Sequence, residues 1–134
     1  MTIYLDFDGT VVEHHYPALG APNPHALRVI AKLQDKGHLV ILNTYRADLN
    51  DGSLEEALAY LNASGEIEAI TEHLEVKVNP PGFDLDEAIH KGELFIDDIS
   101  EGIPIRPNKI LEYGLMLDWI ELERLLINAG ICSI

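Results

Sequence analysis

The chain has 134 residues, which is enough for one domain with a single substantial core. Lys and Arg total 9 against 23 Asp and Glu, and the net charge of -14 disfavours binding to long nucleic acid or to an anionic membrane. Cys132 is the only cysteine, which excludes a disulfide framework and a thiolate metal site. No apolar run approaches the roughly 18 residues of a membrane-spanning helix. The first predicted strand begins almost at the first residue and leaves no room for a targeting peptide, so we expect a cytoplasmic protein.

The first predicted strand covers residues 2–7 and runs into the motif Asp-Phe-Asp-Gly-Thr at residues 6–10. Because side chains alternate along a strand, Asp6 and Asp8 point to the same side. Two carboxylates this close repel each other, so a metal ion, a lysine or a shared proton has to stabilise them. Taken alone, the motif is compatible with a phosphoryl-transfer site, a calcium loop or a plain turn.

Strands and helices alternate along the rest of the chain. We expect helices over roughly residues 24–36, 53–65, 84–90 and 115–130, and strands over 38–44, 67–78 and 93–96. Residues 11–25, 45–52 and 100–109 are expected to be loops, the last with a short strand near Ile103 as an alternative. Asn23 is the expected N-cap of the first helix, and Ser53 is expected to open the second through a capping box. Trp119 is expected in the core.

Uninterrupted apolar strands separated by helices predict an α/β protein, with one doubly wound, three-layer, Rossmann-like parallel sheet in a single domain over residues 1–134. In such sheets, ligands bind at the carboxyl ends of the strands, near a switch in strand order. Thr44 and the pair Asp97-Asp98 follow two other predicted strands. The sequence therefore predicts that these side chains meet the first acidic pair at one edge of the sheet.

These motifs resemble those of the haloacid dehalogenase superfamily of phosphohydrolases, over roughly residues 3–103. The motif at 6–10, Thr44, a downstream lysine and the acidic pair after Ile96 occur in the order of the superfamily. Tyr-Pro-x-x-Gly at 16–20, Asn-Thr-Tyr-Arg at 43–46 and Leu-Phe-Ile-Asp-Asp at 94–98 are similar to its small hydrolases, which lack a cap domain.

The resemblance implies a role for each polar residue of the motifs. Asp6 is the nucleophile that forms an aspartyl-phosphate, and Asp8 is first the general acid and then the general base. Thr44 binds a phosphoryl oxygen. Mg²⁺ is held by the Asp6 carboxylate, the Asp8 backbone carbonyl and the acidic pair, with Asp98 the closer ligand and Asp97 holding the lysine.

Four further residues are expected to contact phosphate or substrate: Gly9, Thr10, Tyr45 and Arg46. Gly9 lets the loop approach the phosphate and turn its N–H groups inward. Arg46 is open to two interpretations, a grip on a phosphate oxygen or a cap of its own loop. His14 and His15 are expected in a solvated loop with no part in metal binding, one of them lining the entrance at most.

The catalytic lysine has two candidates. Lys91 lies six residues before Asp97 in a local sequence similar to that of the small hydrolases, whereas Lys77 lies twenty residues before it, beside the end of a strand. The local sequence favours Lys91 and the expected geometry favours Lys77. We prefer Lys91 and retain both.

The sequence thus predicts a magnesium-dependent phosphatase acting on a phosphate monoester, either a small molecule or a phosphate on a macromolecule. The alternatives are a phosphotransferase of the same fold and an idle domain that binds a phosphorylated ligand or a partner protein. A calcium loop is disfavoured because Val11 and Val12 stand where further acidic ligands are needed. A receiver domain would need an acceptor Asp where the chain has Val78-Asn79. An oligomer is possible, because a second chain can complete an open site.

Overall fold

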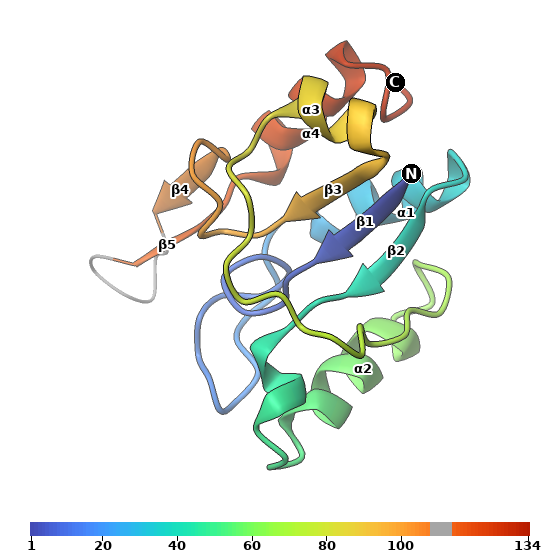
Figure 1. The fold of residues 1–134 in the computed structure, drawn as a ribbon. Coiled ribbons are helices and arrows are strands. Elements are labelled where there is room, and N and C mark those ends of the chain that lie inside the picture. Colours follow the sequence, from blue (N-terminus) through green and yellow to red (C-terminus); the bar gives the residue numbers. More distant parts are fainter. Residues whose placement is uncertain (108–113) are drawn as a thin grey trace.

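A computed structural model describes residues 1–107 and 114–134. At its centre is a parallel sheet of three strands, β1 (Thr2–Leu5), β2 (Leu39–Leu42) and β3 (Glu93–Ile96), in the order β2-β1-β3 (Figure 1). The chain moves from β1 to one neighbour and later returns to the other side of β1. The strand order therefore reverses at β1, which is where parallel sheets of this kind bind ligands.

The register of the sheet aligns the carboxyl ends of its strands. Leu5 lies opposite Leu42 on one side and opposite Ile96 on the other. The ladder continues one residue further, because the Asp6 N–H donates to the Ile96 carbonyl at 2.9 Å and the Asn43 N–H to the Leu5 carbonyl at 2.7 Å. The residues that follow the three strands are therefore direct neighbours.

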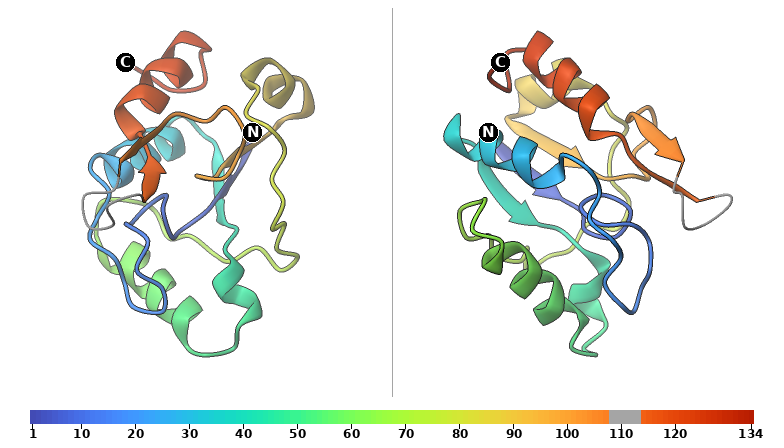
Figure 2. Two further views of the ribbon diagram at one scale, coloured as in Figure 1. Left: turned by 90° about the vertical axis from the view of Figure 1, so that its left-hand side faces the viewer. Right: turned by 180° about the vertical axis from the view of Figure 1, so that it is seen from behind.

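Helices cover both faces of this sheet. They are α1 (Ala26–Asp35), α2 (Ser53–Ala63), α3 (Leu85–Lys91) and α4 (Trp119–Asn128), with a 3-10 helix, η1 (Tyr45–Asp48), after β2. Figures 1 and 2 show α1 and α4 together on one face and α3 on the opposite face. Residues 1–107 and 114–134 form an α/β fold, and they contain no cap domain.

The core lies between the sheet and the helices. Ile3, Leu5, Leu42 and Ile96 are fully buried strand residues. Trp119 is 1% exposed and confirms the prediction of a core position. The helices contribute further buried apolar side chains: Val29, Ile30, Leu33, Ala57, Leu61, Ala88, Leu122 and Leu126.

Two ion pairs connect α1 to α4 at the surface. Arg28 forms two hydrogen bonds to Glu123, at 2.6 and 3.1 Å, and Lys32 approaches the same carboxylate at 2.8 Å. These contacts lower the pKa of Glu123 to about 2. The Arg28 pair is exposed and the Lys32 pair is only partly buried, so each contributes little to stability, on the order of 1 kcal/mol or less.

The predicted strand within residues 67–78 does not form. The chain makes only a parallel bridge there, in which the Leu42 N–H donates to the Thr71 carbonyl at 2.9 Å and the His73 N–H to the Leu42 carbonyl at 2.7 Å. Leu74 is 89% exposed, and Ile70 is buried. The segment has too little apolar surface to bury as a full strand, so the prediction is wrong.

The C-terminal region differs from the prediction as well. A helix beginning at Leu115 was expected, but Leu115–Leu117 form a short strand, β5, antiparallel to β4 (Ile105–Pro107), and α4 begins only at Trp119. Asp118 caps this helix by accepting the Glu121 N–H at 3.1 Å. β4 lies within the predicted loop at 100–109, two residues after the place where a short strand was an alternative. Residues 108 and 109 lie outside the described range.

Neither predicted helix cap forms. His25 precedes α1, and Gly52 precedes α2. The Ser53 N–H donates to Asp51 at 2.9 Å, so an aspartate two residues earlier satisfies the amide. Within residues 1–107 and 114–134, no helix combines the length and the apolar character needed to cross a membrane.

Candidate active site

A cavity of about 290 Å³ lies at the carboxyl edge of the sheet, where the three strands end side by side. The first acidic motif, the Asn43-Thr44 turn and the second acidic pair all contribute to it, as the sequence predicts. The lining residues are Asp6, Asp8, His14, Asn43, Thr44, Tyr45, Val76, Lys77, Val78, Asp97, Asp98 and Ile99.

Three carboxylates converge on this cavity. Asp6, Asp97 and Asp98 each offer an oxygen atom, and these atoms lie within 4.8 Å of one another. Desolvation by burial raises the pKa of Asp6 well above its usual range, and the charges of Asp97 and Asp98 raise it further. Burial also raises the pKa of Asp97, to about 6. Desolvation is the larger cause of both shifts, and repulsion between the neighbouring carboxylates adds to it.

This cluster fits a divalent cation. Hard cations such as Mg²⁺ prefer carboxylate and carbonyl oxygens, and the three side chains supply carboxylate oxygens from two adjacent strand ends. The predicted ligands Asp6, Asp97 and Asp98 are thus brought together. The Asp8 carboxylate is not part of the group, so a role for Asp8 as a ligand would fall to its backbone carbonyl.

Thr10 connects the two acidic motifs. Its hydroxyl donates to Asp6 Oδ2 at 2.9 Å and accepts the backbone N–H of Asp98 at 3.2 Å. Thr10 is fully buried. Thr10, which was predicted to contact phosphate, therefore uses its hydroxyl to hold Asp6, the candidate nucleophile, next to the second acidic pair.

The C-terminal region supports the first motif from behind. The Thr10 carbonyl accepts Trp119 Nε1–H at 2.7 Å and Asn23 Nδ2–H at 2.9 Å. Asn23 also donates to the Leu117 carbonyl at 2.8 Å, and the Leu117 N–H donates to the Gly9 carbonyl at 2.9 Å. In the sequence, Asn23 before a proline indicates a helix cap. Its bond to Leu117 in β5, 94 residues away, cannot be predicted from the local sequence.

His14 lines the cavity, as the sequence allowed for one of the two histidines, but its contact with the second acidic pair was not predicted. Its Nε2 lies 2.7 Å from Asp98 Oδ2, and its side chain is 42% exposed at the mouth of the cavity. The hydrogen bond to Asp98 raises the pKa of His14. Two adjacent histidines have no spacing that indicates a site, so only the folded loop reveals this contact.

Gly9 is required by close approach as well as by its backbone conformation. Its φ is +79°, and a Cβ atom there would overlap His14 Nε2 and lie 2.5 Å from Asp98 Oδ2.

We expect Gly9→Ala to destabilise the protein by roughly 2 kcal/mol or more, measured by urea unfolding. The cost of the left-handed backbone and the cost of displacing the His14 side chain add to each other. Gly37→Ala is the matched control: its φ is +93° with open space around it, so a cost of about 1 kcal/mol is expected. Equal costs would contradict the crowding argument.

Arg46 pairs with Asp8 instead of facing open solvent. Its Nε and Nη2 donate to the two oxygens of Asp8, each at 2.7 Å. The guanidinium also donates to the Ser53 and Ala18 carbonyls, at 3.2 and 3.1 Å. Arg46 is 2% exposed. Of the two sequence interpretations, the structure favours a structural role for Arg46 over a grip on phosphate.

Thr44 and Tyr45 take different positions at the end of β2. Thr44 is 2% exposed, and its hydroxyl accepts the Arg46 N–H at 3.2 Å, which leaves its own proton to donate into the cavity. Tyr45 is 59% exposed on the cavity rim. Thr44 is therefore suited to bind a small anion, as predicted, and Tyr45 is suited to contact a larger group outside.

The structure separates the two candidate lysines. Lys77 lines the cavity, and its backbone N–H and carbonyl bond to the Asn43 side chain at 2.9 and 3.0 Å. Its ammonium lies over the rings of Tyr4 and Phe95, at 5.4 and 5.5 Å from their centres. Asp97, expected to hold the lysine, instead accepts the Ile99 N–H at 3.1 Å.

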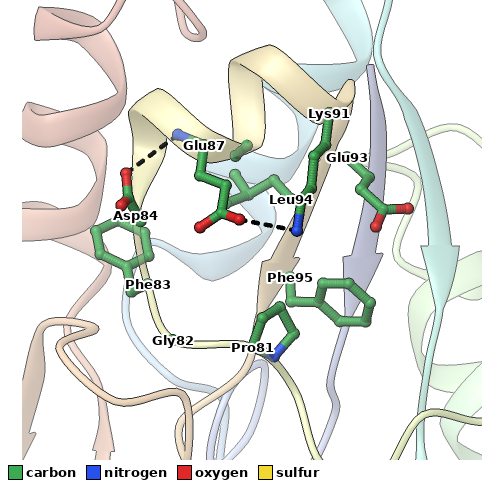
Figure 3. Close-up of a pocket in the computed structure, with 10 residues that line it drawn as sticks. Pro81, Gly82, Phe83, Asp84, Glu87, Lys91, Glu93, Leu94 and Phe95 are labelled. Atoms are coloured by element: carbon green, nitrogen blue, oxygen red, sulfur yellow. Dashed lines mark hydrogen bonds and ion pairs between the residues drawn. The ribbon is translucent and has the colours of Figure 1, made fainter.

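Lys91 lies elsewhere, beside a second cavity next to α3 (Figure 3). Its ammonium pairs with Glu87 one turn earlier, at 2.8 Å, and Gly92, the next residue, bonds to Thr2 at the start of β1. This cavity measures about 40 Å³, room for very few water molecules. The structure does not bring Lys91 to the candidate site, because Lys91 stands at the amino end of the strands, and this placement favours Lys77.

The metal-free protein should lose stability as the pH rises from about 4 to 6. Unfolded aspartates release their protons near pH 4, whereas Asp97 releases its proton near pH 6 in the fold and Asp6 also well above the usual range. The folded state binds more protons in that interval, so the free energy of unfolding falls. The raised pKa of His14 also makes the free energy of unfolding fall with rising pH, at higher pH values. The lowered pKa of Glu123 makes the free energy of unfolding rise with pH, but only below about pH 4.5.

Urea unfolding in a chelator at several pH values measures this trend, and Asp97→Asn should reduce it. A divalent cation at about 100 times its Kd should raise the Tm at pH 7.5 by roughly 5–10 °C. The gain should shrink at pH 5, where protons compete for the carboxylates. Stability that rises steadily between pH 4 and 6 without metal would contradict the charge arrangement.

Comparison with known proteins gives one informative match. No family model and no curated protein matches the chain. A solved structure of a conserved protein from Bacteroides thetaiotaomicron is similar, with 27% sequence identity and a TM-score of 0.63. The match covers 96% of this chain and 90% of that one, so the likeness extends over almost the whole α/β fold.

Proposed function

We propose that this protein is a phosphatase of the haloacid dehalogenase type, with the doubly wound fold of that superfamily and no cap domain. The observation that carries the proposal is the convergence of Asp6, Asp97 and Asp98, with oxygens within 4.8 Å, at the strand-order reversal. A site this acidic can bind a phosphate only with a cation present, and Mg²⁺ would offset the charge of carboxylates and phosphate together. Charge offset and positioning supply most of the catalysis in phosphoryl transfer.

In the first step, a carboxylate oxygen of Asp6 attacks phosphorus. The new oxygen–phosphorus bond forms as the ester bond to the leaving group breaks, and Asp8 donates a proton to the leaving oxygen. Thr10 fixes the Asp6 carboxylate by its 2.9 Å hydrogen bond, and Thr44 is poised to donate to a phosphoryl oxygen. Water then attacks the aspartyl-phosphate, gives its proton to Asp8, and releases phosphate and Asp6.

Asp8 cannot serve as the acid in the arrangement described above. Both of its oxygens accept hydrogen bonds from Arg46, a group that only donates. Proton transfer therefore requires Asp8 to exchange one of these bonds for a contact with the substrate. Its side chain is 17% exposed and lines the cavity, so the carboxyl group is accessible to a substrate there.

Hydrolysis of phenyl phosphate with and without Mg²⁺ tests the proposal. We expect phosphate release that depends on the metal and is abolished by a chelator. Phosphate transferred to glycerol in place of water would indicate the phosphotransferase alternative. Tight binding of phosphate with no turnover of any monoester would indicate the idle domain.

The two lysines provide a matched pair of variants. Lys77→Met should lower kcat/KM for phenyl phosphate roughly 100-fold, because it removes a cation that lines the cavity. Lys91→Met should change it less than about twofold, since an exposed pair on α3 is lost. The opposite ranking in steady-state kinetics would restore Lys91 as the catalytic lysine.

A further inference from the structure

The candidate active site has a polar floor and an apolar rim. The rim consists of Tyr45, Val76, Val78 and Ile99, which line the same cavity as the carboxylates. Exposed fractions of 59% for Tyr45, 44% for Val78 and 66% for Ile99 leave much apolar surface uncovered. Single exposed apolar residues are ordinary, but several around the mouth of one charged cavity indicate binding.

These rim residues come from three different connections. Tyr45 begins η1 after β2, the two valines follow the bridge at Glu72, and Ile99 follows the second acidic pair after β3. Each connection also contributes a polar residue to the cavity lining: Thr44, Lys77 and Asp98 respectively. A molecule whose phosphoryl group reaches the floor must therefore extend past the rim.

We propose that the leaving group of the substrate is uncharged and apolar, an aryl or alkyl group held by the rim. This inference rests on the proposed hydrolase function and specifies its substrate class. Over Val76, Val78 and Ile99, a sugar or polyol would meet side chains that cannot form hydrogen bonds, and its polar groups there would lose water without replacement. A further phosphate on the leaving group would face a chain of net charge -14.

The size of the cavity agrees with this substrate class. A volume of about 290 Å³ lies at the lower end of small-molecule sites, enough for a phosphoryl group and about one ring. A second ring would extend over the exposed faces of Ile99 and Tyr45. Binding should therefore improve as apolar surface is added to the leaving group.

The test compares phenyl phosphate with 2-naphthyl phosphate, which differ by one apolar ring, in the presence of Mg²⁺. For the wild-type protein we expect a KM roughly five- to tenfold lower for the naphthyl ester. Ile99→Ser and Val78→Ser should bring the ratio of the two KM values close to one. Ile89→Ser is the control, because Ile89 is similarly exposed, at 48%, on α3 outside the cavity, and should keep the wild-type ratio.

Calorimetry with phenylphosphonate and 2-naphthylphosphonate separates this inference from the proposed function. If neither ester is hydrolysed, the proposed function fails, while a preference for the naphthyl phosphonate that Ile99→Ser removes would still support the rim. Equal KM values in the wild type, or a lower KM for glycerol phosphate than for phenyl phosphate, would overturn the inference. It would also be overturned if Ile99→Ser changed the oligomeric state in sedimentation but not the ratio, because the rim would then be an interface between copies.

Discussion

Asp6→Asn should reduce the turnover of phenyl phosphate by roughly 10³-fold or more and at the same time stabilise the metal-free protein. The loss is large because the amide cannot attack phosphorus, and the covalent route closes. The gain in stability follows from the raised pKa of Asp6, since ionising that carboxyl beside Asp97 and Asp98 opposes folding at neutral pH. Steady-state kinetics and urea unfolding at pH 7.5 measure the two effects.

Asp35→Asn is the matched control for this variant, because Asp35 is an exposed aspartate at the end of α1. Asp35→Asn should leave turnover unchanged, and it should change the free energy of unfolding by no more than about 0.5 kcal/mol. Asp6→Asn should also weaken the thermal stabilisation by Mg²⁺, since one of the three converging carboxylates is lost. Retention of most activity by Asp6→Asn would exclude the aspartyl-phosphate mechanism.

Arg46→Gln is expected to cost about 3 kcal/mol of folding free energy. The substitution leaves Asp8 without its two 2.7 Å hydrogen bonds and removes the donors to the Ser53 and Ala18 carbonyls. Removing one member of a buried ion pair leaves the other charge without a partner, which is among the most destabilising of single changes. Arg46→Lys should recover only part of the loss, because an ammonium lacks the planar fork.

Kinetics of the Arg46 variants decide between its two interpretations. A residue that positions Asp8 should affect kcat for phenyl phosphate, whereas a residue that grips phosphate should mainly raise KM. We expect kcat to fall at least about tenfold with KM within about threefold of wild type. Arg28→Gln is the control: Arg28 is also bidentate, but it is exposed, and it should cost less than about 1 kcal/mol. A large rise in KM alone would restore Arg46 as a phosphate ligand.

The residues that hold the site in place make contacts that cannot be predicted from the pattern of apolar and polar residues in the sequence. β4 and β5 have three residues each, too few for a hydrophobic period, and β5 directly precedes a helix whose apolar stripe includes its first residue, Trp119. Asn23 and His14 act through bonds to Leu117 and Asp98, 94 and 84 residues away. Distant partners of this kind are chosen by the packed fold, so local propensity gives no indication of them.

The sequence by itself determined the three strands of the parallel sheet, the presence of the four helices, and the positions of Asp6, Thr44 and the pair Asp97-Asp98 at strand ends, but its strand within residues 67–78 was wrong. Apolar runs and helix stops are local signals, and parallel strands place their carboxyl ends at one edge. The tertiary structure alone decided which groups pair there: Arg46 with Asp8, His14 with Asp98, and Lys77 rather than Lys91 at the cavity. Pairing of side chains depends on loop paths and strand register, and both are fixed only when the sheet and its helices pack together.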